Sequence, residues 1–274
     1  MNWIDPVHAV DKAADFIRSV LAGAGRDSLV IGLSGGIDSA VAAGVAVQAL
    51  GQDKVHGVMM PYQTSSAASL TDAQAVADTL GMSVEKVEIT PMAEAFLREM
   101  NTEDRIRRGN VMARCRMVVL YDRSARDGSL VLGTGNRTEA LLGYTTMYGD
   151  NACALNPIGQ LYKTEVRALC AHLGLPESVL TKAPSADLWE GQADEDELGF
   201  SYEEVDRMLM RMVDEGLGVR QLTALGFATE LVERVQTRMR AMAFKRAAPP
   251  VCAFANRRNP EDGDLAGGKD GGFH

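Results

Sequence analysis

The first residues that could do chemistry form a glycine-rich turn between two apolar stretches. The turn reads Ser34-Gly35-Gly36-Ile37-Asp38-Ser39. The run at 29–33 before it has the length and composition of a buried parallel strand, and the Ala/Val-rich stretch after it predicts a helix over 39–50. Glycines let the backbone approach a ligand closely, and the N–H groups at the start of a helix face a bound anion. The sequence therefore predicts a phosphate-binding turn.

This turn lacks the Gly-Lys-Ser/Thr ending of the Walker loop, whose lysine reaches the β- and γ-phosphates. Asp38 stands there instead, and its carboxylate could hold Mg²⁺. The hexapeptide resembles the pyrophosphatase loop of enzymes that cleave ATP between the α- and β-phosphates and transfer AMP. The alternative is an ordinary strand–turn–helix corner, but the full motif after a clean strand favours nucleotide chemistry.

A second glycine-rich segment follows another predicted strand. It reads Leu132-Gly133-Thr134-Gly135-Asn136-Arg137-Thr138-Glu139. In a doubly wound sheet, both turns would open on the same crevice at the carboxyl ends of the strands. Asp38 and Glu139 could then share a Mg²⁺ ion, which binds few carboxylates together with phosphate oxygens. Taken alone, Glu139 is more simply explained as an acidic residue in the first turn of a helix, where the helix dipole favours it.

Alternating strands and helices must position these two turns. Short apolar strands are expected at 29–33, 55–60, 84–89 and 129–133, with helices at 39–50, 71–80 and 107–126 between them. Thr71-x-x-Gln74 is expected to cap the helix at 71–80. This order predicts an α/β fold with a doubly wound parallel sheet of four to five strands and its ligand at the strand ends.

Helices dominate the remainder of the chain. The spacing of apolar residues over 6–22 predicts an amphipathic helix that packs on the domain or on a partner subunit. The C-terminal part is expected to be helical, with helices at 163–173, 201–215 and 228–244. Ser201 is expected to cap the middle one. The acidic segment 187–199 reads as a loop that could act as a mobile lid. We expect one domain over 1–260 and a disordered tail over 261–274.

Composition excludes several classes of protein. The 274 residues carry a net charge of −9, which argues against a nucleic-acid partner, since such partners need a basic face. The four cysteines form no Cys-x-x-Cys pair, so we expect neither a zinc site nor a redox motif but reduced, mostly buried thiols in a cytoplasmic protein. No run of eighteen apolar residues occurs, so no membrane span is expected.

Seven further segments together resemble the ammonia-dependent NAD synthetase family, within the N-type ATP pyrophosphatase superfamily. They are Gly109–Met117, Gly133–Glu139, Tyr148–Asp150, Asn156–Gly159, Tyr162–Glu165, Pro184–Gln192 and Phe244–Arg246. They occur in order behind the turn at 34–39, and the resemblance spans roughly residues 6–260. An ordered set of this kind is far more specific than any one motif.

The resemblance implies an adenine nucleotide alpha-hydrolase-like fold and an amide-forming ligase. In that family, Mg-ATP adenylates the nicotinate carboxylate of deamido-NAD with release of pyrophosphate, and ammonia then displaces AMP to give NAD. The expected partners are thus deamido-NAD, ATP and ammonia, with Mg²⁺ as the cofactor. The family forms homodimers, so a homodimer is expected here.

The resemblance also assigns roles to individual residues. The expected ATP contacts are Gly32, Leu33, Ser34, Gly35, Gly36, Ile37, Asp38, Ser39, Thr134, Lys163 and Ser185. Asp38 and Glu139 would hold Mg²⁺. The expected contacts to deamido-NAD are Arg114, Phe244 and Lys245. Asp150 and Lys163 would be catalytic, with Asp150 receiving ammonium.

Without the resemblance, each of these residues has a simpler explanation. Thr134 and Ser185 would be turn or cap residues, and Asp150 a turn residue beside a glycine. Lys163 would be a solvated lysine at the start of a helix, although a cation there opposes the helix dipole. Arg114 would be a charge on a helix surface.

The chain departs from the family pattern at three positions, of which the first two face the dinucleotide. Met147 and Ala154 replace a lysine and an aspartate found in many bacterial members, and Phe244 replaces the histidine of a His-Lys-Arg sequence. Lys245 is left as the matching cation. These changes bear on how deamido-NAD is held more than on the reaction.

Two other classes of protein remain as alternatives. The same ATP loop serves GMP synthetase, argininosuccinate synthetase and tRNA-thiolating enzymes, although the missing Cys-x-x-Cys and the acidic charge disfavour thiolation. A nucleotide sensor of the universal-stress type would bind ATP without turnover, but it would not need paired carboxylates. Glutamine-dependent relatives carry a glutaminase domain ahead of the ATP loop. Since only about thirty residues precede the loop here, too few for a domain, we expect free ammonia to be the direct donor.

Overall fold

A four-stranded parallel sheet forms the centre of the computed structural model, which describes residues 3–184 and 199–252. The strands are β1 (Leu29–Gly32), β2 (Val55–Met59), β3 (Val84–Lys86) and β4 (Leu130–Val131), in the order β3-β2-β1-β4. Leu29 pairs with Val55 on one side and with Leu130 on the other, so β1 lies inside the sheet. The predicted parallel sheet is confirmed, and an isolated parallel bridge between Leu132 and Leu155 continues its β4 edge.

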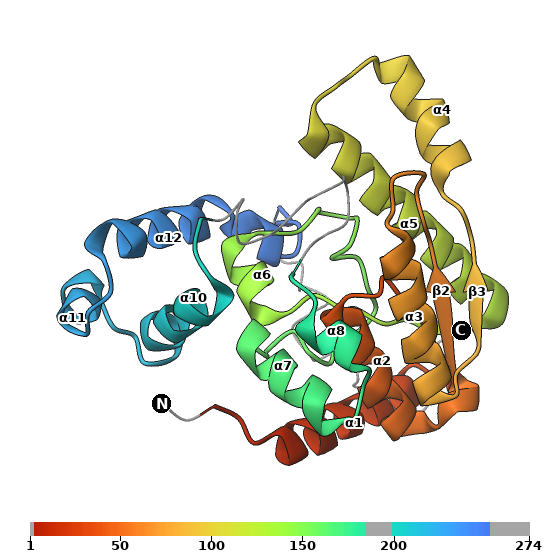
Figure 1. Cartoon of the computed structure of the whole chain (residues 1–274), viewed down its shortest axis with the longest axis horizontal. Helices are drawn as coiled ribbons and strands as arrows, with labels where there is room; N and C mark the ends of the chain where they lie inside the picture. The colour runs from red at the N-terminus through yellow and green to blue at the C-terminus, as the bar shows by residue number, and fades with distance from the viewer. Residues whose placement is uncertain (1–2, 185–198, 253–274) are drawn as a thin grey trace.

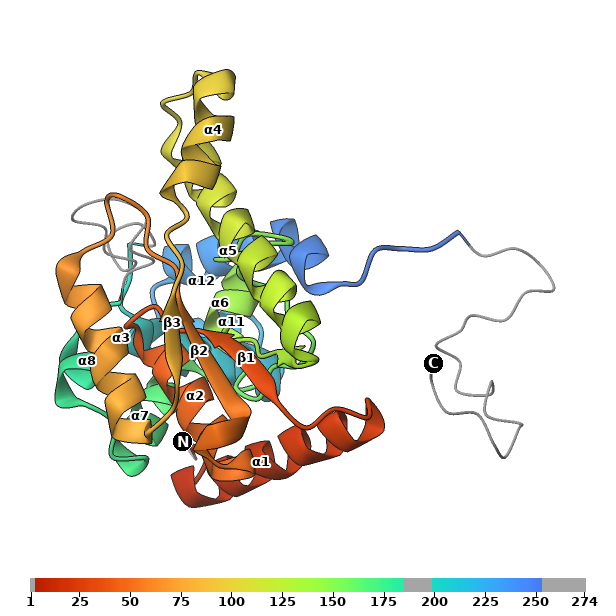
Figure 2. The ribbon, with the colours of Figure 1, turned by 90° about the vertical axis from the view of Figure 1, so that its right-hand side faces the viewer.

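Helices cover both faces of the sheet, as a doubly wound fold requires (Figures 1 and 2). One face carries α1 (Pro6–Gly23), α2 (Ile37–Leu50), α3 (Ala67–Leu80) and α7 (Lys163–His172), and the other carries α4 (Thr90–Met100) and α5 (Arg105–Asp127). Successive side chains of a strand point to opposite faces. Accordingly, Leu29 and Ile31 join the core beneath α2, whereas Val30 joins the core beneath α5.

The C-terminal part is helical, as predicted, and has a core of its own. It contains α6 (Arg137–Leu142), α8 (Glu177–Thr181), α10 (Tyr202–Leu209), the π-helical turn η2 (Met210–Asp214), α11 (Val219–Ala224), α12 (Thr229–Ala241) and the 3₁₀ turn η3 (Ala243–Arg246). Buried Leu142 of α6, Tyr162, Leu209 and Val232 pack in one cluster there. This cluster ties α10 and α12 to the helix that follows the second glycine-rich turn (Figure 1).

Several local predictions need correction. The helix predicted at 71–80 begins at Ala67, because the Ser66 side chain caps it by accepting from the Ser69 N–H; Thr71 lies inside the helix and donates to the Ala67 carbonyl. The helix predicted at 201–215 is α10 followed by a π-helical turn, although Ser201 does cap it. The helices α4, α8 and α11 and the 3₁₀ turn η1 (Gln52–Lys54) were not predicted, and of α6 only the start near Glu139 was expected.

Three predictions fall wholly or mostly beyond the part of the chain that can be described. Most of the acidic segment 187–199 and the whole tail 261–274 lie outside the described residues, as does Ser185. Among the helices that are described, none has the length and apolar character of a membrane span.

Candidate active site

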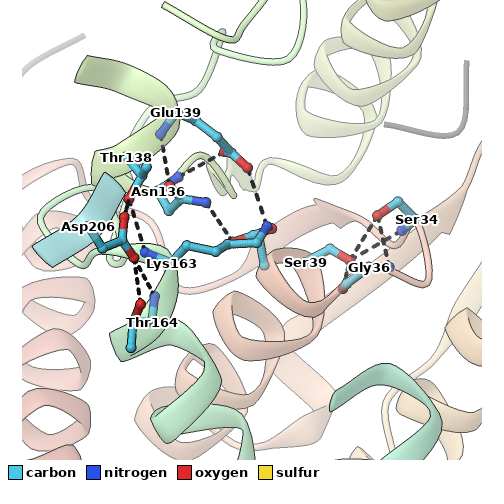
Figure 3. Close-up of polar contacts among 10 residues, drawn as sticks. Ser34, Gly36, Ser39, Asn136, Thr138, Glu139, Lys163, Thr164 and Asp206 are labelled. Atoms are coloured by element: carbon cyan, nitrogen blue, oxygen red, sulfur yellow. Dashed lines mark hydrogen bonds and ion pairs between the residues drawn. The ribbon is translucent and has the colours of Figure 1, made fainter. Parts of the chain in front are cut away.

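The first glycine-rich turn connects the end of β1 to the start of α2 and is held by its own hydroxyl groups. The Gly36 N–H donates to Ser34 Oγ at 3.2 Å, and the Ser34 N–H approaches Ser39 Oγ at 3.3 Å. Ser39 Oγ donates to the Gly36 carbonyl at 2.9 Å, and the two serine hydroxyls lie 3.1 Å apart (Figure 3). This turn at the N-terminus of a 14-residue helix has the geometry of an anion site.

Gly35 is required at its position for two reasons. Its φ is +74°, in the left-handed region that favours glycine. A Cβ there would lie 2.1 Å from the Ser69 carbonyl oxygen of α3. The Lys182 ammonium lies 3.5 Å from the Gly35 carbonyl and forms an ion pair with Asp72 at 2.9 Å. The turn is thus packed tightly against α3.

The second glycine-rich turn contacts the first through Asn136, which sequence reasoning left without a role. Its side chain accepts the Glu139 N–H at 3.0 Å, while the Glu139 carboxylate accepts the Asn136 N–H at 3.2 Å, so the two form a capping box for α6. The Asn136 amide also donates to Asp38 Oδ1 at 2.9 Å. Asn136 is fully buried. It therefore fixes the spacing between the two predicted metal-binding carboxylates.

Lys163, at the start of α7, extends its side chain toward Glu139 (Figure 3). Its ammonium forms ion pairs with Asp38 and, at 3.4 Å, with Glu139. It also lies 5.2 Å from the centre of the Tyr202 ring. Only 3% of Lys163 is exposed, so the interpretation as a solvated lysine is wrong. Glu139 is compatible with both of its interpretations, as a helix-capping residue and as a Mg²⁺ ligand, because it caps α6 and also lines the cavity described below.

Most of the predicted ATP contacts line one cavity of about 280 Å³. From the predicted ATP contacts, the lining includes Gly32, Leu33, Ser34, Gly36, Asp38, Ser39, Thr134 and Lys163, and it also includes the predicted metal ligand Glu139 and the predicted catalytic Asp150. Gly35 and Ile37 do not line it, and the Ile37 side chain is buried in the core beneath α2. Within the described residues, no group of three His, Cys, Asp or Glu side chains could hold a metal. Of the carboxylates in the lining, Asp38 and Glu139 both contact Lys163.

Asp150 lines the same cavity and is also exposed to solvent, which places it at the rim. Its carboxylate accepts the Thr146 N–H at 2.6 Å. The residue keeps an exposed surface, but surrounding protein partly desolvates its carboxylate and raises the pKa of that group, and the bond from Thr146 and the nearby Lys245 charge offset this in part. Lys245 donates to the Gly143 and Thr145 carbonyls at 2.9 and 2.6 Å, and burial lowers the pKa of its ammonium.

The three residues expected to contact deamido-NAD do not line this cavity. Arg114 is exposed on α5 and donates to the Met147 carbonyl at 3.2 Å. Phe244 is 57% exposed, and neither it nor Lys245 lines the cavity. These assignments stay predictions.

The described thiols do not resemble activated nucleophiles. All four cysteines are unbridged, and Cys115 and Cys170 are buried, whereas Cys252 is exposed. Burial raises the pKa of the Cys153 thiol and raises that of Cys170 to about 11. These upward pKa shifts disfavour the nucleophilic thiolate form of both residues.

Comparison with known proteins identifies the family. A family model described as NAD synthase matches residues 9–249. The chain belongs to the NAD synthase family. It is therefore an enzyme, an ATP-using ligase of NAD biosynthesis, as the resemblance implies.

Individual members of the NAD synthase family cover nearly the whole chain. The "NH(3)-dependent NAD(+) synthetase" of Chlorobaculum tepidum is 50% identical over 242 residues, which are 88% of this chain and 87% of that protein. The solved structure of NMN synthetase from Francisella tularensis has a TM-score of 0.82 at 32% identity, covering 92% of this chain and 100% of that one. That of NH3-dependent NAD synthetase from Campylobacter jejuni has a TM-score of 0.78 at 35% identity, covering 91% and 100%.

Proposed function

We propose that this enzyme adenylates the nicotinate carboxylate of deamido-NAD with ATP and amidates it with ammonia, giving NAD, AMP and pyrophosphate. The observation that carries the proposal is the convergence of Asp38, Glu139 and Lys163 beside a phosphate-binding turn. Relatives that are named NH(3)-dependent NAD(+) synthetases and are about half identical support it.

The chemistry accounts for this arrangement. A carboxylate is a poor acyl donor and must first gain a leaving group. Its oxygen attacks the α-phosphorus of ATP, and the bond to the β-phosphate oxygen breaks, releasing pyrophosphate. The backbone N–H groups of the first turn and the Lys163 ammonium are suited to bind the phosphates as negative charge moves onto the leaving group. Attack by ammonia on the acyl carbon then expels AMP.

The paired carboxylates also suit Mg²⁺. Asp38 and Glu139 both contact one ammonium, Lys163, so they already converge on a single cation. Two carboxylates together with phosphate oxygens are the usual donors for this ion. When bound, Mg²⁺ would neutralise phosphate charge. Asp38 and Glu139 would hold it, and Asn136 would keep Asp38 in place.

For the second half-reaction, we assign Asp150 to ammonium. A carboxylate with a raised pKa, at the rim of the cavity, is suited to bind ammonium and take its proton before attack. Thr134 and Ser185 remain assigned to ATP, and Arg114, Phe244 and Lys245 to deamido-NAD, on the family resemblance.

A second candidate acceptor is nicotinate mononucleotide. The neighbour with a TM-score of 0.82 is named an NMN synthetase. This chain also has Met147, Ala154 and Phe244 where many bacterial NAD synthetases have polar or charged residues toward the dinucleotide. The two acceptors share the reacting carboxylate, so the site chemistry described above serves either one.

Three wider assignments accompany the proposed activity. We assign residues 1–260 to one domain, consistent with a family match over 9–249. We also propose a homodimer. A cytoplasmic location stays a proposal that rests on the absence of paired cysteine motifs.

The proposed function is tested by supplying purified protein with ATP, Mg²⁺ and ammonium, and with deamido-NAD or nicotinate mononucleotide in separate reactions. NAD, AMP and pyrophosphate should form in equal amounts from deamido-NAD, and a chelator should stop the reaction until Mg²⁺ is restored. Glutamine in place of ammonium should give no sustained NAD formation. Preference for the mononucleotide would favour the second candidate, and ADP with orthophosphate as primary products would exclude both.

A further inference from the structure

A buried carboxylate behind the catalytic cluster takes no part in the reaction described above. Asp206 of α10 has no exposed surface. Its Oδ1 accepts the Thr138 hydroxyl at 2.5 Å, and its Oδ2 accepts the Thr164 N–H at 2.7 Å and the Thr164 hydroxyl at 2.8 Å. All three bonds cross from α10 to residues at least 42 positions away in the chain.

These bonds join the starts of two helices that carry site residues (Figure 3). Thr138 precedes Glu139 in the first turn of α6, and Thr164 follows Lys163 in the first turn of α7. The Thr138 hydroxyl, which donates to Asp206, also accepts the Lys163 N–H at 3.1 Å. One carboxylate therefore connects the backbone of Lys163 to the turn that bears Glu139.

The ammonium end of Lys163 is supported from the same helix. Tyr202 lies four residues before Asp206 on α10, so the two share one helix face. The Tyr202 ring lies 5.2 Å from the Lys163 ammonium. Helix α10 thus contacts Lys163 both at its charged end, through Tyr202, and at its backbone, through Thr138 and Asp206.

Burying a carboxylate is unfavourable, and burial raises the pKa of Asp206, although the three bonds from Thr138 and Thr164 lower it in part. An apolar residue of similar size would avoid that cost but would leave the Thr164 N–H without an acceptor. The arrangement is therefore explained by what the carboxylate holds in place rather than by packing alone.

We propose that Asp206 is a positioning residue, which holds the first turns of α6 and α7 in register so that Glu139 and Lys163 converge on Asp38. The inference rests on the proposed function, because it assigns Asp206 to the step in which ATP phosphates are held. Asp206 acts through these residues and does not line the cavity itself. Its loss should slow adenylation without weakening the binding of deamido-NAD.

The test compares Asp206→Ala and Asp206→Asn in the ammonium assay and in deamido-NAD-dependent ATP–pyrophosphate exchange. Asp206→Ala should lower the kcat of both reactions at least tenfold and change the KM for deamido-NAD less than threefold. Asp206→Asn can keep an oxygen toward Thr164 and turn its amide toward the Thr138 hydroxyl, so it should retain at least a third of the wild-type kcat. Folded Asp206→Ala with kcat within twofold of wild type would overturn the proposal.

If Asp206→Ala does not fold, variants of Thr138 test the same connection between Asp206 and Lys163. Thr138→Val removes the hydroxyl between Asp206 and the Lys163 N–H, whereas Thr138→Ser keeps it. The first should lose at least tenfold in kcat and the second less than threefold; equal activities would overturn the proposal. Ser201→Ala, which removes only the α10 cap, is the matched control and should leave kcat unchanged. If wild-type protein makes no NAD, the proposed function itself fails.

Discussion

Lys163 and Asp150 mark two parts of one cavity that suit two different steps. Lys163 is almost fully buried between the carboxylates of Asp38 and Glu139, where it can respond to phosphate charge. Asp150 lies at the rim, and burial of its carboxylate raises its pKa. A variant at the rim should therefore impair amidation and leave adenylation in place.

Asp150→Asn should separate the two half-reactions. Asparagine can still accept the Thr146 N–H but cannot take a proton from ammonium, so NAD formation should fall by about a hundredfold or more. Deamido-NAD-dependent ATP–pyrophosphate exchange should stay within a few-fold of wild type. Near-normal NAD formation by the variant at neutral pH would remove Asp150 from the role.

The raised pKa of Asp150 also predicts how stability changes. A carboxyl whose folded pKa exceeds its unfolded value favours folding at low pH, and that contribution is lost as pH rises through the folded pKa. At neutral pH the charge of Asp150 therefore disfavours the folded state. Asp150→Asn should not lower the Tm measured at pH 7, and a clear decrease there would contradict this pKa shift.

At the scale of elements, periodicity predicted the helices and strands that are long or strongly patterned. The strand–turn–helix units around β1 and β4 follow from apolar runs that end in glycines, and they placed Asp38 and Glu139 at one crevice. The start of α3 was predicted wrongly because two serine-or-threonine caps compete there, and the Ser66 side chain is the one that bonds. Helix α4 could have been predicted from Pro91 and the spacing of Ala93 and Leu97.

Part of the site could not be predicted from local sequence. Asn136 and Asp206 act on residues 98 and 42 to 68 positions away, and no pattern within a short window reports such contacts. Both resemble ordinary polar residues at helix ends or on helix surfaces. Burial of Lys163 likewise follows from α10 packing over α7, which is a tertiary effect.

The turn between β1 and α2 can be tested with two glycines of similar conformation. Gly35 and Gly174 have φ values of +74° and +63°, which cost other residues about 1–2 kcal/mol. A Cβ at Gly174 meets nothing within 4 Å, whereas one at Gly35 meets the Ser69 carbonyl at 2.1 Å. Gly174→Ala should lower the Tm by a few degrees and keep the KM for ATP. Gly35→Ala should raise that KM at least tenfold; an unchanged KM would mean that the turn does not hold ATP.

At the scale of the whole molecule, exposed apolar side chains gather on three helices. They are Val7 and Phe16 of α1, Met92, Phe96 and Met100 of α4, and Ile106, Val118 and Tyr121 of α5. Helix α4 and the start of α5 project from the body of the molecule (Figures 1 and 2). We expect part of this apolar surface to contact a second copy of the chain.

We expect a homodimer that buries more than about 2,000 Å², as obligate pairs do. Light scattering at micromolar concentration should give twice the 29.4 kDa mass of the chain. Changing Phe96 or Val118 to Glu should weaken association, whereas Val251→Glu, at an exposed apolar residue beyond η3, should not. An active enzyme that stays monomeric at this concentration would contradict the prediction.

In the proposed mechanism, the nicotinate carboxylate itself attacks the α-phosphorus of ATP. Deamido-NAD labelled with ¹⁸O in both carboxylate oxygens tests this directly, with the products read by mass spectrometry after a single turnover with ammonium. One labelled oxygen should appear in AMP and the other in the amide of NAD, with none in pyrophosphate. Label in orthophosphate or ADP, or AMP without label, would contradict the account.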